Sequence, residues 1–148
     1  MNLKIALSSL VFALTSGCAT VHPPLKLYEG DLPQGQRPAL LKPAYAVVIK
    51  SADGREINLA ATGTLNANEY ELQFMPGRHV LEVNYNSGIM WSTVPRRMAV
   101  ELQGGRKYVI RPTTIGHTWK PFLLDVTDRP NCWTVSVGVL LGPSGCDE

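Results

Sequence analysis

The chain has 148 residues, of which fourteen are Lys or Arg and twelve are Asp or Glu, and its formal net charge is +2. This near balance, without a basic stripe, argues against nucleic acid as a partner. Thirteen glycines, eleven prolines and a charged fraction of 18% are typical of an all-β chain with one core.

Residues 1–17 have the pattern of an export signal. Lys4 precedes an apolar run over residues 5–14, and the small residues Ser16 and Gly17 follow it. A membrane-spanning helix needs about twenty apolar residues, so this run is too short to cross a bilayer alone. We predict a cleaved signal peptide over residues 1–17 and leave it out of the fold.

The end of this segment, residues 14–20 (LTSGCAT), resembles the lipobox of bacterial lipoproteins. Ser16 and Gly17 fit the two small positions before Cys18, whereas Thr15 stands where the family has a leucine-like residue. The resemblance implies cleavage before Cys18, a diacylglycerol thioether on its sulfur and acylation of its new amino group. Two or more acyl chains hold a protein stably on a membrane. The alternative is an ordinary signal peptide beside a coincidental cysteine.

Residues 18–43 are expected to link this anchor to the domain. Ala19 stands where the family's inner-membrane retention signal is an aspartate, so the resemblance implies transfer to the outer membrane, facing the periplasm. Five prolines within residues 20–43 argue against a long helix or a central strand. We predict an extended, lipid-anchored tether over residues 18–43, with a reach of about 3.3 Å per residue, and a folded domain over residues 44–148.

In the predicted domain, apolar and polar side chains alternate with the period of two that half-buried strands show. Strands are predicted over residues 45–50, 55–59, 70–74, 81–85, 98–102, 108–110, 122–126 and 133–140. Turn-forming residues at 51–54, 75–78 and 104–105 predict three antiparallel hairpins, and residues 60–68 and 112–120 are predicted loops. About eight short strands at this spacing predict a small antiparallel β-sandwich.

One stretch, residues 70–85 (YELQFMPGRHVLEVNY), resembles PEGA-type envelope domains, in which a strand leads through a Pro-Gly turn into a second strand. The matching residues are Pro76, Gly77, His79, Leu81 and Val83. Residues 104–108 (GGRKY) resemble the glycine turn and aromatic strand that close such domains. The resemblance implies a β-sandwich with a non-enzymatic role in the cell envelope, and it transfers no catalytic residue.

Three cysteines are present, and with Cys18 assigned to lipid, Cys132 and Cys146 remain. In an oxidising compartment a remaining pair is usually bridged, so we predict a Cys132–Cys146 disulfide. Closing a loop of about fifteen residues stabilises a fold by about 3 kcal/mol in the chain-entropy model. The alternative is two free thiols.

The candidate binding surface is the predicted loop around Trp119, with His117, Lys120 and Trp91. Aromatic and cationic side chains on loops are common in recognition surfaces, and sugars stack on such rings. The alternative is that Trp91 and Trp119 fill space at the open ends of the sandwich.

No catalytic or metal-binding motif is found in the sequence. His22, His79 and His117 lack metal-ligand spacing and no nucleophile motif occurs, so we predict no metal, no cofactor and no enzymatic activity. The alternative is an envelope hydrolase that uses His117 and Asp125 as an acid–base pair.

Together, these interpretations predict an outer-membrane lipoprotein with a periplasmic β-sandwich. We expect this domain to be a non-catalytic binding or assembly module, with an envelope protein or glycan as its partner. A structural subunit of an envelope complex is a further alternative that the sequence leaves open.

Overall fold

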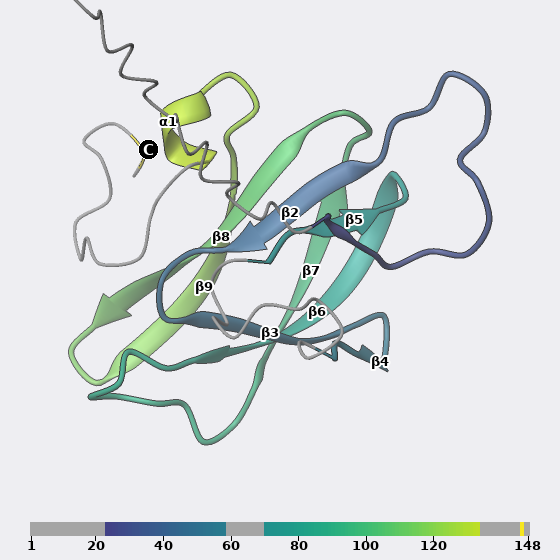
Figure 1. Ribbon diagram of the computed structural model, residues 1–148. Helices are drawn as coiled ribbons and strands as arrows, with labels where there is room; N and C mark the ends of the chain where they lie inside the picture. The colour runs from purple at the N-terminus through teal and green to yellow at the C-terminus, as the bar shows by residue number, and fades with distance from the viewer. Residues whose placement is uncertain (1–22, 59–69, 134–145, 147–148) are drawn as a thin grey trace, which may run out of the picture.

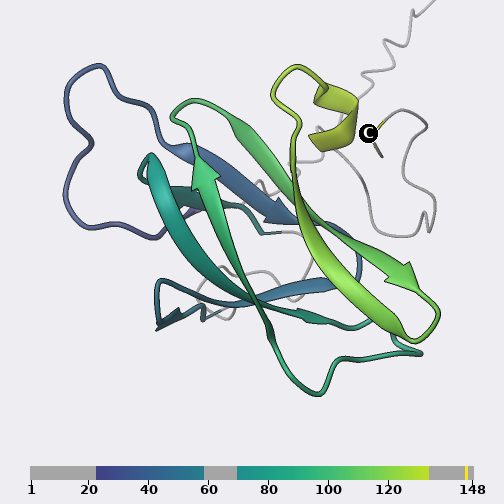
Figure 2. The ribbon, with the colours of Figure 1, turned by 180° about the vertical axis from the view of Figure 1, so that it is seen from behind.

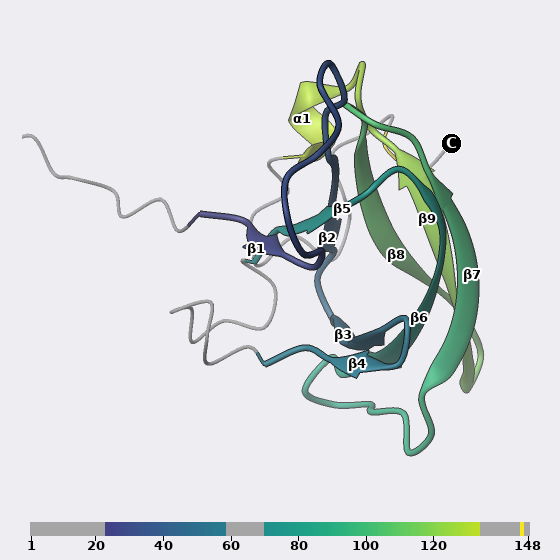
Figure 3. The ribbon, with the colours of Figure 1, turned by 90° about the vertical axis from the view of Figure 1, so that its right-hand side faces the viewer.

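The computed structural model describes residues 23–58, 70–133 and 146, which form two facing β-sheets (Figures 1 and 3). One sheet has the order β1-β5-β2-β8-β9 and the other the order β4-β3-β6-β7, so the predicted all-β sandwich is confirmed. The predicted signal peptide, Cys18 and the predicted loop at 60–68 lie outside the described residues. The elements are β1 (Leu25–Lys26), β2 (Ala39–Pro43), β3 (Val47–Ala52), β4 (Arg55–Glu56), β5 (Leu72–Phe74), β6 (Gly77–Tyr85), β7 (Arg96–Leu102), β8 (Lys107–Ile115), β9 (Thr118–Asp125) and α1 (Pro130–Trp133).

The main core lies between the two sheets and follows from the alternation of side chains along the strands. Leu81 and Val83 of β6 are fully buried, whereas Glu82 between them is exposed and accepts a hydrogen bond from Ser51 Oγ (3.1 Å). Each fully buried aliphatic side chain stabilises the fold by about 1.5–3 kcal/mol. Every described member of the core lies at or after Leu25, so a chain that begins at residue 18 retains all of them.

Two of the three predicted hairpins are wrong, because the chain changes sheets at their turns. β5 belongs to the five-stranded sheet, whereas β6 pairs with β3 and β7 in the other sheet. Likewise, β7 is followed by β8, which pairs with β2 and β9 across the sandwich. Such short turns reverse the chain equally well within one sheet or between two, and burial of both apolar faces decides between these arrangements.

The third predicted hairpin, around residues 51–54, is confirmed as β3–β4. Ala52 pairs with Arg55, and the two loop residues Asp53 and Gly54 have φ values of 51° and 77°. Positive φ at both positions is the requirement of a type I′ turn, which Asp-Gly meets at low steric cost. The Asp53 carboxylate also accepts a hydrogen bond from the Val80 amide (2.8 Å), which fixes this turn against β6.

Part of the predicted tether is a strand inside the five-stranded sheet. β2 lies between β5 and β8, and Leu41 pairs with Leu72 on one side and Tyr108 on the other. The prediction that prolines exclude a central strand here is therefore wrong. Pro43 lies beyond Leu41, the last residue of β2 that pairs with β5, so its missing N–H removes no bond from that ladder.

The predicted loop at 112–120 is instead the far half of the long β8–β9 hairpin (Figure 2). The two strands pair continuously from Tyr108–Asp125 to Ile115–Thr118. Gly116, the first of the two turn residues, has a φ of 59°, which suits the first position of a type II′ turn. The alternation within 112–120 therefore continues β8 and β9, and His117 lies at the hairpin turn.

The last predicted strand, 133–140, begins on Trp133, which is in fact the final residue of α1, and residues 134–140 lie outside the described residues. The ring of Trp133 lies beneath the ammonium groups of Lys42 (4.6 Å) and Lys107 (5.3 Å). Burial and, to a lesser extent, the charge of Lys107 lower the pKa of Lys42, against the opposing charge of Glu71.

Among the described residues, no helix is long and apolar enough to span a membrane.

The predicted disulfide is confirmed: Cys132 of α1 is bonded to Cys146, with Cα atoms 5.6 Å apart. Both cysteines are buried in a second apolar cluster that includes Val109 and Val126. Val109 alternates with the core residues of β8, so this cluster lies on the outer face of the five-stranded sheet. The bond and α1 together cover that face.

Candidate functional site

Two connections meet at the end of the sandwich that lies far from α1 (Figures 1 and 2). One is residues 86–95 between β6 and β7, and the other is the β8–β9 turn. We refer to residues 86–95 and 115–118 as the tip. Because β6 and β7 belong to one sheet and β8 and β9 to the other, the tip joins both layers of the sandwich.

Internal hydrogen bonds fix the shape of the longer connection. The Ser87 amide donates to the Met90 carbonyl oxygen (2.9 Å), and the Met90 amide donates to Ser87 Oγ (3.2 Å). Ser92 closes the base of the connection, since its amide donates to the Tyr85 carbonyl oxygen (2.7 Å) and its Oγ accepts from the Tyr85 amide (2.9 Å). These bonds hold Ile89 at the apex of a closed turn.

The tip places large apolar side chains in water. The exposed fractions are 89% for Ile89, 69% for Trp91, 69% for Val94 and 73% for Ile115. Within the described part of the chain, every exposed large hydrophobic residue except Met75 belongs to the tip. Single exposed apolar side chains are common, but a cluster of this kind typically marks an interaction surface.

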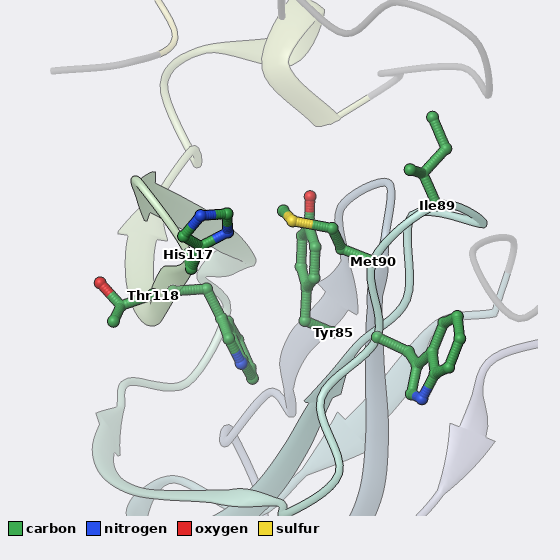
Figure 4. Close-up of a pocket in the computed structure, with 7 residues that line it drawn as sticks. Tyr85, Ile89, Met90, His117 and Thr118 are labelled. Atoms are coloured by element: carbon green, nitrogen blue, oxygen red, sulfur yellow. The ribbon is translucent and has the colours of Figure 1, made fainter.

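A groove of about 270 Å³ separates the two connections of the tip (Figure 4). The rings of Tyr85 and Trp119 stack beside it, with centroids 5.5 Å apart and an interplanar angle of 30°. The side chain of Met90 points across Tyr85 toward His117, whereas Ile89 lies at the outer edge of the groove and is mostly in solvent. The lining residues are Tyr85, Ile89, Met90, Trp91, His117, Thr118 and Trp119.

The structure brings together three of the four residues predicted for binding. Trp91, His117 and Trp119 line the groove, whereas Lys120 is exposed on β9 outside it. Trp119 is only 8% exposed, so its ring fills the core, as the alternative interpretation expected, while Trp91 is open to solvent. Sequence reasoning missed Ile89; the available signal was a run of three apolar residues, 89–91, between polar turns.

The predicted acid–base pair is not brought together. His117 lies at the β8–β9 turn and Asp125 at the opposite end of β9, about 26 Å away along an extended strand. Asp125 accepts hydrogen bonds from Thr127 and from Arg106 Nη1 (3.0 Å). Burial would raise the pKa of Asp125, but these bonds and the charge of Arg106 hold it below its usual range. Asp125 is thus an ionised partner of Arg106.

His79 is also occupied by neighbours. Its Nδ1 lies 2.7 Å from Asp53 Oδ2 and its Nε2 lies 2.8 Å from the Met75 carbonyl oxygen. Both ring nitrogens of His79 are therefore in contact with protein oxygens, and neither is free for a substrate. A larger cavity of about 700 Å³ lies beside His79.

Among the described residues, no three His, Cys, Asp or Glu side chains gather to hold a metal ion.

The tip therefore combines an exposed apolar surface with a shallow groove at one end of the domain. No family model, curated protein or solved structure matches this chain. Its function is accordingly inferred from its residues and their placement.

Proposed function

We propose that the protein is an outer-membrane-anchored periplasmic lipoprotein, that its β-sandwich is a non-catalytic binding or assembly module, and that the tip is the binding surface. The observation that carries this proposal is the cluster of exposed apolar side chains at Ile89, Trp91, Val94 and Ile115. Apolar surface in water costs about 25 cal/mol for each Å². A partner that covers the tip would recover this free energy.

The anchor is proposed at Cys18, on the resemblance of its flanking residues to a lipobox. β1 begins at Leu25, so seven residues link the anchored cysteine to the sheet and span about 23 Å at most. This link is shorter than the tether predicted over residues 18–43. The domain would therefore work close to the membrane surface.

Photo-crosslinking in living cells tests the tip. A photoreactive residue at Ile89 is expected to form adducts with a neighbour, which can be a protein, a glycan or a lipid. The matched control is Gln103, which is exposed in the β7–β8 connection at the opposite end of the sandwich. The same adducts from both positions, or none from Ile89, would contradict the proposal.

The anchor is tested separately by Cys18→Ser. We expect this substitution to abolish acylation and to release the protein from the membrane fraction. Retention of both properties would refute the lipobox interpretation while leaving the tip open to its own test.

A further inference from the structure

The apolar side chains of the tip extend into solvent beyond the groove that some of them line. Ile89 stands at the apex of the turn closed by Ser87 and Met90, at the outer edge of the groove, and its side chain is almost fully in solvent (Figure 4). Val94 and Ile115 are mostly exposed too, and these two residues lie outside the lining of the groove. A protein partner would need a matching pocket for each projecting side chain, whereas the interface of a bilayer accepts them without shape matching.

The residues that surround these side chains are basic. Residues 85–97 and 112–121 contain Arg96, Arg97 and Lys120 and no Asp or Glu. The nearest acidic residue in the β6–β7 ladder is the exposed Glu82, opposite Arg97. All three cations are exposed, and none forms an ion pair with another described residue. An arginine or lysine beside an anionic membrane raises affinity about fivefold. The charge at this end of the domain is therefore complementary to anionic lipid headgroups.

We propose that the tip binds the surface of an anionic lipid bilayer, with Ile89 and Trp91 in the interfacial region and Arg96, Arg97 and Lys120 at the headgroups. This inference rests on the proposed role of the tip as a binding surface and names its partner. Tryptophan suits this position because its ring is apolar and its N–H is polar. The link of about 23 Å at most to Cys18 would keep the domain near such a surface.

Vesicle binding tests the inference on residues 18–148 carrying Cys18→Ser, which cannot be acylated and retains every described core residue. The vesicles contain phosphatidylcholine alone or phosphatidylcholine with phosphatidylglycerol. We expect salt-sensitive binding to the mixed vesicles, about tenfold weaker in Ile89→Ser and about fivefold weaker in Arg96→Gln. Met75→Ser, a change at an exposed apolar side chain of the opposite end, should bind as the parent chain does.

Tryptophan emission provides a second readout. Trp119 and Trp133 are 8% and 9% exposed, whereas Trp91 is 69% exposed, so a shift to shorter wavelength on vesicle binding reports Trp91. The shift should disappear in Trp91→Phe. An unchanged spectrum in the parent chain would overturn the proposed insertion.

Equal binding by the parent chain and by Ile89→Ser overturns the inference, as does equal binding to vesicles of phosphatidylcholine alone. Ile115→Ser provides a second tip variant, and thermal unfolding checks that each variant is folded. A protein crosslinked at Ile89 in cells, together with no vesicle binding, overturns the lipid partner and leaves the tip as a binding surface. If Ile89 forms no crosslink and vesicles are not bound, both proposals fail.

Discussion

Removal of the Cys132–Cys146 disulfide should destabilise the whole domain. Both cysteines are buried with Val109 and Val126 on the outer face of the five-stranded sheet. The Cys146 carbonyl oxygen also accepts a hydrogen bond from Nη1 of the buried Arg111 (2.7 Å). The bond therefore holds both α1 and Cys146 against β8.

The size of the effect follows from the length of the closed loop. The two cysteines are 14 residues apart, and the chain-entropy model gives about 3 kcal/mol for a loop of this length. If Cys146 also leaves Arg111, the lost hydrogen bond to a charged group adds about 1.5–3 kcal/mol. For a domain of this size, 3 kcal/mol lowers the Tm by about 10 °C.

The variant with both Cys132→Ser and Cys146→Ser should be compared with the parent chain by urea and thermal unfolding. The parent chain under reducing conditions is the matched control and should show the same loss. A Tm within about 2 °C of the parent value, which is less than 1 kcal/mol, would refute the coupling. In that case a change in Trp133 emission alone would mean that α1 unfolds locally without the sheet.

Two further substitutions test buried and charged hydrogen bonds. Tyr70→Phe should lower the free energy of unfolding in urea by about 1–3 kcal/mol, because the buried Tyr70 hydroxyl accepts a hydrogen bond from the Ile49 amide (3.0 Å). The control is Tyr45→Phe, which should lower it by less than about 0.5 kcal/mol, because the half-buried Tyr45 hydroxyl has only a 3.4 Å contact with the Ser87 carbonyl oxygen. Asp53→Asn tests pH dependence, since burial would raise the pKa of Asp53 but hydrogen bonds from His79 and a backbone amide lower it below its ordinary 3.8. The ionised carboxylate therefore stabilises the fold above that value, by about 1 kcal/mol or less at this half-exposed site. The advantage over Asp53→Asn should be lost as the pH falls from 3.8 through the lowered pKa of the folded state. A difference that is constant with pH would contradict this reasoning.

The sequence predicted the strands better than their partners. The alternation at Leu81 and Val83 identifies β6 because it reflects burial of one face, which is a local property of the chain. The partner of β6 depends on which distant strand buries the same face, and a Pro-Gly turn is compatible with either sheet. β2 was not predicted because it contains Pro43. This proline is compatible with the sheet only because the pairing with β5 ends at Leu41, which the sequence does not show.

The same distinction applies to the site. Trp91 and Trp119 both lie between predicted strands, yet Trp91 is exposed and Trp119 is buried. Trp119 is buried because Tyr85, which lies on a strand of the other sheet, stacks on its ring. No local pattern contains that contact. The exposure of Ile89 likewise depends on the turn that Ser87 and Met90 close.

The strand order also determines when the domain can form. Leu40 of β2 pairs with Lys107 of β8, and in the five-stranded sheet only β8 and β9 are consecutive neighbours. A chain that emerges from a translocation pore with its N-terminus first cannot pair β2 with β8 until β8 has crossed, and the sheet is complete only after β9 has followed. If the protein is exported as proposed, its N-terminal half would therefore stay unfolded while it crosses the membrane. The outer face of the five-stranded sheet would be covered only after Cys146 has also crossed.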